Sequence, residues 1–251
     1  MNKKILLFIV EGLSDKDALE PILSEMIDNN NIHFEVLHHD LTSVVNRGTI
    51  VQNKKQILLE RITDSIKSYL NVNRGIERKD IKKVIILTDT DGCFIPSSNI
   101  YFSENDKNFR YEDNGIYSDR PEAVNNRNII KSQNLKIAIS TPKVYSLPLE
   151  IYYFSCNLDH VLFNIRNLDI SLKEEYAINF SDQYENREID FLDFIFHQDL
   201  CLSQSYEIAW KKIEEENNSL LRFSNFNTFF INNHDILNTE TKEKISKLLS
   251  K

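Results

Sequence analysis

Two short apolar runs constrain the fold of this chain more than any other feature of its sequence. The first spans residues 4–10 and the second spans residues 81–88, with the core Val84-Ile85-Ile86-Leu87. Both lack the alternation of a strand with one solvent-exposed face, so each predicts a strand that is covered on both faces. Such strands belong to parallel sheets, whose connections are usually helices. The chain is therefore expected to have an α/β fold.

The segments between these runs carry helical and strand patterns. Ser14-Asp15-Lys16-Asp17 opens a helical pattern with Ser14 as the expected N-cap. A second strand is predicted over residues 32–37, and a long amphipathic helix over residues 50–70. The order β-α-β-α-β predicts a mostly parallel, Rossmann-like sheet flanked by helices, with its functional site at the carboxyl ends of the strands.

The rest of the chain divides near residue 145. Residues 92–119 are polar and aperiodic, which predicts an irregular insertion beside the site. A short helix over residues 123–132 and a fourth strand over 136–140 should follow. Beyond that point helical patterns dominate, at residues 149–168, 191–196, 206–221 and 242–249. We expect a catalytic domain over residues 1–145, with the insertion at about 92–119, and a mostly helical C-terminal extension over residues 146–251.

The composition favours a soluble, folded chain. Of its 251 residues, 41% are hydrophobic, which is enough for a sizeable core. No apolar stretch approaches the roughly 20 residues that span a bilayer. The three scattered cysteines give neither a disulfide framework nor a zinc pattern. We therefore expect a cytoplasmic protein without membrane association. The formal net charge of −8 means that nucleic-acid binding would need a local basic patch, bound cations or a basic partner.

Acidic residues follow both buried runs. Glu11 comes directly after the first, with Asp15 one helical turn later, and Asp89 and Asp91 come directly after the second. Because the carboxyl ends of parallel strands lie side by side, these acids are expected to meet. Carboxylates gathered in this way repel one another unless a proton or a cation intervenes. Oxygen ligands without histidine or cysteine suit Mg²⁺ or Mn²⁺.

The two acidic motifs resemble those of the Toprim domain of topoisomerases, primases and the overcoming-lysogenization-defect (OLD) nucleases. They read Glu11-Gly12-Leu13-Ser14-Asp15 and Asp89-Thr90-Asp91-Gly92. The acid four residues after the glutamate is most similar to the OLD-type and phage-defence Toprim nucleases. The resemblance covers about the first 145 residues. It implies a Toprim-like fold and a Mg²⁺- or Mn²⁺-dependent endonuclease acting on DNA or RNA. It also implies a role in defence against phage, with an ABC-type ATPase as a partner.

The resemblance implies roles for individual residues as well. The metal ligands would be Asp15, Asp89 and Asp91. Glu11 would either bind the metal or act as general acid and base, and one or two metal ions would stabilise charge on the scissile phosphate and activate water. Because OLD-like nucleases use a lysine near the site, Lys143 after the expected fourth strand is a candidate for this role. Glu150 is a candidate for an additional metal ligand.

Two other functions fit the same residues. Asp89-Thr90-Asp91-Gly92 also matches the nucleophile motif of haloacid-dehalogenase-like phosphatases, with Asp89 as covalent nucleophile and Thr141 as phosphate-binding residue. That interpretation leaves Glu11 unexplained and places the motif on the third strand rather than the first. The other alternative is a catalytically silent Toprim module that binds a partner or a structural metal. The choice between DNA and RNA, and the oligomeric state, stay open.

Several residues have simpler explanations than a functional one. Asp15 alone fits a helix-cap residue. His38-His39-Asp40 resembles a metal cluster, but adjacent residues of a strand point to opposite faces, which favours surface or structural histidines. The clustered aromatic residues fit a core better than a base-stacking surface. They are Tyr145, Tyr152, Tyr153, Phe154, Phe226, Phe229 and Phe230.

Overall fold

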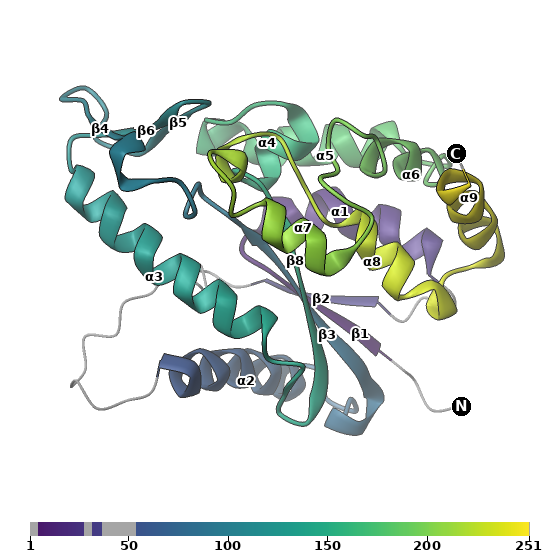
Figure 1. Ribbon diagram of the computed structural model, residues 1–251. Coiled ribbons are helices and arrows are strands. Elements are labelled where there is room, and N and C mark those ends of the chain that lie inside the picture. Colours follow the sequence, from purple (N-terminus) through teal and green to yellow (C-terminus); the bar gives the residue numbers. More distant parts are fainter. Residues whose placement is uncertain (1–4, 28–31, 37–53, 251) are drawn as a thin grey trace.

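The computed structural model describes residues 5–27, 32–36 and 54–250. In this part of the chain a five-stranded sheet lies between two layers of helices, and a three-stranded sheet stands at one end (Figure 1). The predicted α/β class is confirmed, since helices flank a mostly parallel sheet.

The elements follow one another as the sequence predicts up to β3. The strands are β1 (Ile5–Val10), β2 (Ile32–Val36), β3 (Ile81–Asp89), β4 (Ile100–Phe102), β5 (Arg110–Glu112), β6 (Gly115–Ser118), β7 (Lys143–Val144) and β8 (Leu147–Phe154). The α-helices are α1 (Leu13–Met26), α2 (Lys54–Val72), α3 (Pro121–Ile139), α4 (Leu158–Phe163), α5 (Lys173–Gln183), α6 (Asp190–Ile195), α7 (Tyr206–Lys212), α8 (Asn227–Asn232) and α9 (Thr239–Leu249).

The central sheet has the strand order β2-β1-β3-β8-β7. β1 is parallel to both β2 and β3, and β3 is parallel to β8, so that Asp89 lies opposite Phe154. β7 is antiparallel to β8, as the short hairpin between them requires. The carboxyl ends of β1, β3 and β8 therefore lie together at one edge of the sheet, which we call the carboxyl edge.

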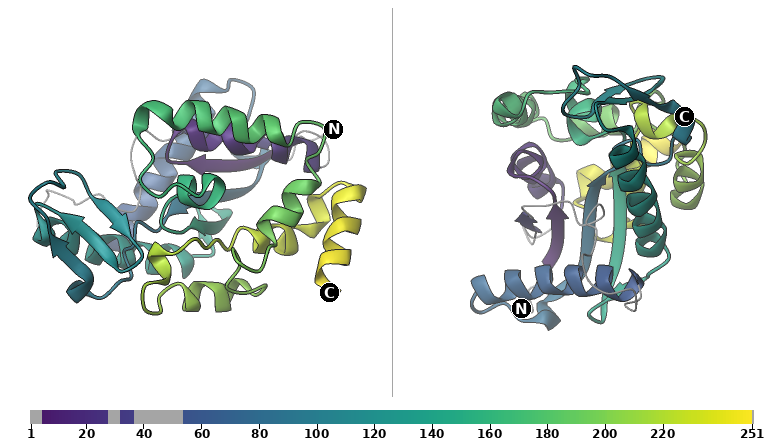
Figure 2. Two further views of the ribbon diagram at one scale, coloured as in Figure 1. Left: turned by 90° about the horizontal axis from the view of Figure 1, so that it is seen from above. Right: turned by 90° about the vertical axis from the view of Figure 1, so that its left-hand side faces the viewer.

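Both faces of β1 are buried, which explains its continuous apolar sequence. Leu6, Phe8 and Val10 pack in one core with α1, α4, α5, α6, α8 and α9. Leu7 and Ile9 pack in a second core with α2, α3 and α7. In the right-hand view of Figure 2, α1 and α3 lie on opposite sides of the sheet. The molecule thus has three layers around a doubly covered sheet.

The strand predicted over residues 136–140 is wrong, because these residues form the last turn of α3 and its C-cap, Ser140. The fourth parallel strand is β8. It begins two residues before the predicted helix 149–168 and takes up the first part of it, to Phe154. Pro148 and Glu150 interrupt its apolar pattern. Glu150 is tolerated inside the sheet because Lys83 of β3 neutralises it, with Nζ 2.5 Å from Oε1.

The segment 92–119 is more regular than its sequence suggests. It forms the small sheet β4-β6-β5, with β4 parallel and β5 antiparallel to β6. Its strands have three or four residues each, too few to show a period in the sequence. The small sheet projects beside the start of α3, at the end of the molecule that also holds α4 (Figure 1; Figure 2, left).

The C-terminal part of the described chain is mostly helical, as predicted. α6 and α9 match the predicted helices 191–196 and 242–249, whereas α7 ends well before residue 221. β8 and the following helices complete the central sheet and its cores beyond residue 145, where a boundary was expected. Within the described residues, no helix is both long and apolar enough to cross a membrane.

Some predicted features lie outside the described residues. They are the motif His38-His39-Asp40, the end of the second strand at residue 37 and the start of the following helix at 50–53.

We predict that Phe229→Ala lowers the free energy of unfolding by about 3–5 kcal/mol. Phe229 of α8 is fully buried, and its ring centroid lies 5.5 Å from that of Phe8 and 5.8 Å from that of Tyr152. The change removes a contact between the C-terminal helices and the sheet, and denaturant titration measures the loss. Ile178→Ala, at a side chain that is 45% exposed, is the control and should cost less than about 0.5 kcal/mol. Equal losses in both variants would contradict a shared core.

Candidate metal centre

Acidic side chains stand where two neighbouring parallel strands end. Glu11 follows β1 directly, and Asp89 is the last residue of β3. The hydroxyl of Thr88 donates a hydrogen bond to Oε1 of Glu11 at 3.0 Å, which links the two strand ends. The structure therefore brings together the two acids that the sequence places after its buried runs.

Asp89 is the most strongly perturbed of these acids. One of its oxygens, Oδ1, accepts a hydrogen bond from the backbone N–H of Leu158 at 2.8 Å. Burial raises the pKa of the Asp89 carboxyl well above its usual range. The negative charges of Glu11, Asp91 and Asp15 raise this pKa further. These four carboxyl groups consequently form one electrostatic cluster at the carboxyl edge.

Asp15 is both a helix-start residue and a member of this cluster. Its Oδ2 accepts a hydrogen bond from the N–H of Gly12 at 3.0 Å. Gly12, rather than the predicted Ser14, is the N-cap of α1. Burial, together with the nearby charge of Asp159, raises the pKa of Asp15 to about 6. Asp15 thus takes part in capping the start of α1, and its charge also adds to the repulsion that Asp89 experiences.

A tight turn after β3 places Asp91. Both Asp91, with φ +50°, and Gly92, with φ +66°, have left-handed backbone conformations. A Cβ atom on Gly92 would lie 2.4 Å from Cδ2 of Leu220, so this position has no room for a side chain. The N–H of Asp91 donates to the carbonyl oxygen of Cys156 at 2.7 Å. The turn is thereby anchored to the end of β8.

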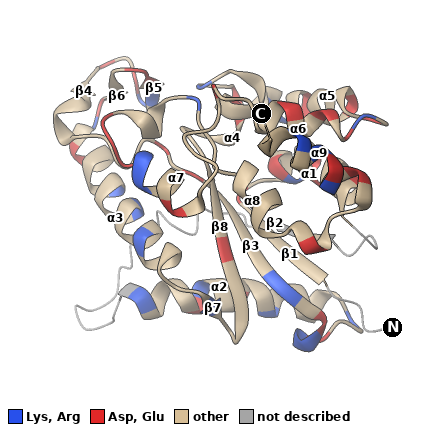
Figure 3. Cartoon of the chain, turned by 45° about the vertical axis from the view of Figure 1, so that its right-hand side comes forward, with Lys and Arg blue, Asp and Glu red and all other residues tan. Residues whose placement is uncertain are grey.

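Basic side chains from α3 hold Asp91 in place. The side chain of Lys131 is fully buried, and its Nζ lies 2.5 Å from Oδ2 of Asp91. Arg127 donates to the carbonyl oxygen of Asp91 and to the hydroxyl of Tyr111, both at 2.8 Å. That hydroxyl in turn donates to Oδ1 of Asp91 at 3.3 Å. Figure 3 shows several basic residues along α3. The acids therefore face a positively charged helix.

Sequence reasoning missed Lys131. The buried residues along α3 include Val124, Asn128, Lys131, Leu135 and Ala138, which recur every three or four positions. A lysine on the buried stripe of a helix requires an acidic partner, so the full period would have revealed it. The helix was predicted only over residues 123–132, which made the stripe too short to recognise.

A second acid–lysine pair flanks Asp15. Asp159 of α4 is 2% exposed, and its Oδ2 lies 2.6 Å from Nζ of Lys173 at the start of α5. Burial opposes the ammonium form of Lys173, yet the hydrogen bond that it donates to Asp159 and the charges of Asp159, Asp89 and Asp15 raise its pKa. Lys173 is therefore held as a cation near the cluster. No sequence pattern pointed to this pair, because its members lie in different elements.

The structure does not bring Lys143 or Glu150 to the acids. Lys143 pairs with Pro148 at the start of β8, whereas Asp89 lies opposite Phe154 at its end. Six residues of strand, about 20 Å, separate these positions. Lys143 was expected near the acids because a strand was predicted before it. In the structure α3 carries the chain away from the carboxyl edge before Lys143 is reached. Glu150 lies within β8 and bonds with Lys83 and other neighbours instead.

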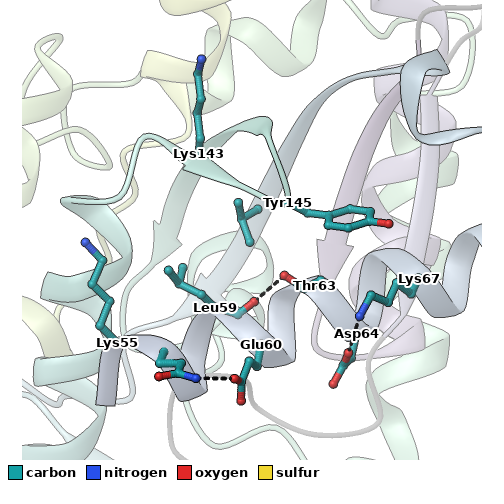
Figure 4. Close-up of a pocket in the computed structure, with 10 residues that line it drawn as sticks. Lys55, Leu59, Glu60, Thr63, Asp64, Lys67, Lys143 and Tyr145 are labelled. Atoms are coloured by element: carbon teal, nitrogen blue, oxygen red, sulfur yellow. Dashed lines mark hydrogen bonds and ion pairs between the residues drawn. The ribbon is translucent and has the colours of Figure 1, made fainter. Parts of the chain in front are cut away.

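A cavity of about 690 Å³ lies near this distant end of the sheet, between α2 and the β7–β8 hairpin (Figure 4). The residues that line it include Lys55, Glu60, Asp64, Lys143 and Tyr145. None of the acids of the carboxyl edge lines it. The cavity and the acid cluster are therefore separate features of the molecule.

Similarity to other proteins does not identify the acid cluster. The chain matches no protein-family model, no curated protein and no solved structure. The Toprim resemblance therefore depends on the two acidic motifs, and the ligand of the cluster has to be argued from its donor atoms.

Those donor atoms fit a hard divalent cation. The four acids offer carboxylate oxygens, which suit Mg²⁺ or Mn²⁺ better than Zn²⁺. A cation among them would also relieve the repulsion that raises the pKa of Asp89. Among the described residues, no three acidic, histidine or cysteine side chains form a preassembled ligand set. Asp91 instead contacts Lys131, and Asp15 contacts the backbone of Gly12. A cation would compete with these contacts.

We predict that Asp89→Asn raises the melting temperature in EDTA near neutral pH, by about 2–4 °C for each kcal/mol of repulsion removed. A carboxyl group with a raised folded pKa stabilises the fold at low pH, and this contribution is lost as pH rises through the folded pKa. Asparagine keeps an acceptor for the Leu158 N–H and removes the charge. The advantage of the variant should therefore shrink as pH falls from neutral towards the ordinary aspartate pKa of about 4, because Asp89 of the folded wild type takes up its proton before the unfolded chain does.

Thermal unfolding of both proteins across this pH range measures the difference. The comparison cancels other titrating groups, since they are common to both chains. A variant that is less stable than the wild type at every pH would contradict the repulsion inferred at Asp89.

Proposed function

We propose that the chain is a Mg²⁺- or Mn²⁺-dependent nuclease whose Toprim-like domain hydrolyses phosphodiester bonds in DNA or RNA. The proposal depends on one observation, the convergence of Glu11, Asp15, Asp89 and Asp91 on the carboxyl edge of a parallel sheet. Burial and neighbouring acids raise the pKa values of Asp89 and Asp15, and perturbed carboxyl groups of this kind are typical of functional sites. The buried Lys131 pairs with Asp91 and so holds this acid in place within the cluster.

The residues at the cluster divide into proposed metal ligands, a proton acceptor and a positioning residue. When bound, a divalent cation supplies positive charge to the phosphate and lowers the pKa of bound water. Asp89 and Asp91, with Asp15, would hold it. Glu11 is fixed at the strand end by the hydrogen bond from Thr88, and it would accept the proton of the attacking water at its carboxylate. Lys131 is a positioning residue, because its ammonium group fixes Oδ2 of Asp91.

The partner and the biological role follow from the resemblance to OLD-type nucleases. A chain with net charge −8 has little general attraction for polyanions. We therefore propose that an ABC-type ATPase supplies additional basic surface and that the complex acts in defence against phage.

The placement of Thr141 gives the phosphatase alternative less support. Its hydroxyl donates to the carbonyl oxygen of Ile137 at 2.7 Å, at the C-terminal end of α3. Lys131, which contacts the acids, lies ten residues earlier, or about 15 Å along the helix. Thr141 is therefore out of reach of a phosphate held at Asp89.

We predict that the purified chain cleaves supercoiled plasmid or total tRNA with Mg²⁺ or Mn²⁺ and not with EDTA. Glu11→Gln and Asp89→Asn should each reduce the rate by at least about 100-fold, because they remove a proton acceptor or a metal ligand. Mg²⁺ should also raise the melting temperature of the wild type and not that of Asp89→Asn. Hydrolysis of p-nitrophenyl phosphate without cleavage of either nucleic acid would favour the phosphatase. If the chain shows neither activity and its melting temperature does not respond to Mg²⁺, a silent module is favoured.

We further predict that Lys131→Met reduces the cleavage rate by about 100-fold, because Asp91 loses the charge that fixes it. Lys143→Met is the matched control, since Lys143 is exposed and lies at the opposite end of the sheet. It should leave the rate within about twofold of wild type. The Mg²⁺-dependent shift in melting temperature should persist in both variants. Equal loss of activity in the two variants would contradict the role of Lys131.

A further inference from the structure

The small sheet carries a row of planar side chains across its three strands. Tyr101 of β4 lies opposite Tyr117 of β6, which lies opposite Arg110 of β5. The two tyrosine rings have centroids 4.9 Å apart, and the guanidinium carbon of Arg110 lies 4.4 Å from the centroid of Tyr117. Cross-strand neighbours of this kind share one face of a sheet. We call this face the stacking face.

The opposite face of the same sheet points to the acids. Tyr111 follows Arg110 directly, so its side chain lies on the other side of β5. There it joins Ile116, which is fully buried, and its hydroxyl reaches Oδ1 of Asp91 at 3.3 Å. The stacking face and the acid cluster are thus separated by the thickness of one strand and the length of one tyrosine.

Hydrogen bonds hold the small sheet rigidly against the rest of the molecule. The side chain of Asn167 donates to the carbonyl oxygen of Tyr111 and accepts from its N–H, both at 2.9 Å. Arg166 forms an ion pair with Asp113, just after β5. Asn99, just before β4, donates to Asn217 at 2.8 Å. The stacking face is therefore fixed in position relative to the acids.

The charges of the stacking face are largely balanced. Arg110 is paired with Asp106 through Nε at 2.9 Å and with Glu112 through one terminal nitrogen at 2.6 Å. Its side chain is 39% exposed. The hydroxyl of Tyr117 accepts from the side chain of Asn114 at 3.0 Å, which orients the ring. This face presents oriented planar groups rather than excess positive charge.

We propose that the stacking face binds unpaired bases of single-stranded nucleic acid beside the acid cluster. Aromatic rings and guanidinium planes are the groups on which unpaired bases stack, whereas the bases of a duplex are already stacked and paired. The proposal rests on the nuclease function and names its substrate class as single-stranded. Because Arg110 is charge-balanced, binding to this face depends on stacking more than on phosphate contacts, and it responds weakly to salt.

The test measures binding in EDTA, where metal-dependent cleavage does not occur. Fluorescence anisotropy compares labelled single-stranded DNA and RNA of about 16 nucleotides with duplexes of the same sequence. The double variant Tyr101→Val with Tyr117→Val removes both rings while keeping side chains that favour strands. It should weaken single-strand binding by about tenfold or more. Tyr145→Asn, at a partly exposed tyrosine at the far end of the central sheet, is the control and should bind as the wild type does, since asparagine tolerates the left-handed backbone at this position, with φ +50°.

Circular dichroism and the Mg²⁺-dependent melting shift verify that the double variant is folded. Unchanged affinity in a folded double variant would overturn the proposal. So would tighter binding of duplexes, a steep loss of affinity with salt in the wild type, or no binding of any oligonucleotide.

A small phosphodiester separates this inference from the nuclease function. Bis(p-nitrophenyl) phosphate has no nucleotide chain that could run from the acid cluster to the opposite face of the small sheet, so its hydrolysis reports on the acid cluster. If the double variant hydrolyses it normally but has a raised KM for oligonucleotides, both proposals stand. If the double variant also cleaves oligonucleotides normally, the proposal for the stacking face is wrong and the nuclease proposal stands. If the wild type binds single strands through both tyrosines but hydrolyses no phosphodiester, the stacking face stands and the nuclease is wrong.

Discussion

The burial of an ionisable acid at the end of the central strand is the constraint on which the rest of the site depends. Asp89 ends β3, the strand that pairs with β1 on one side and β8 on the other. Its carboxyl group meets both desolvation and the charges of its acidic neighbours. A backbone N–H at the start of α4 donates a hydrogen bond to this carboxyl group, and the charge of Lys131 on α3 lowers its pKa. Both faces of the sheet therefore contribute to stabilising one carboxyl group.

The positive charges around the cluster come from both helical layers. Lys131 lies on α3, which packs on one face of the sheet, and Lys173 begins α5, which packs on the other. Each ammonium group is bound to an acid other than Asp89, namely Asp91 and Asp159. Among the described residues, Asp89 is therefore close to compensating charge without an ion pair of its own. This partial compensation lets the fold tolerate the buried acid while the repulsion among the carboxyl groups still raises the pKa of Asp89.

The sequence predicted the parts of the fold that local patterns determine. β1 and β3 are covered on both faces, so their apolar runs and the acids that follow were readable from single segments. The parts that were missed contain polar residues whose partners lie far away in the chain. Glu150 in β8 depends on Lys83, and Lys131 in α3 depends on the acid turn after β3. A local pattern treats such residues as evidence against burial, because their compensation appears only in three dimensions.

The segment between Asp91 and the end of α3 supplies several of the side chains that contact the acid turn. After Asp91 the chain leaves the carboxyl edge, forms the small sheet and returns to the same edge as α3. Tyr111, Arg127 and Lys131 all lie on this excursion, and all three contact Asp91. Because Arg127 also binds the hydroxyl of Tyr111, the small sheet and α3 are joined directly at the acid turn. Because Tyr111 and Arg110 are adjacent residues of β5, any displacement of this strand would move the Tyr111 hydroxyl that contacts Asp91 together with Arg110 on the opposite face.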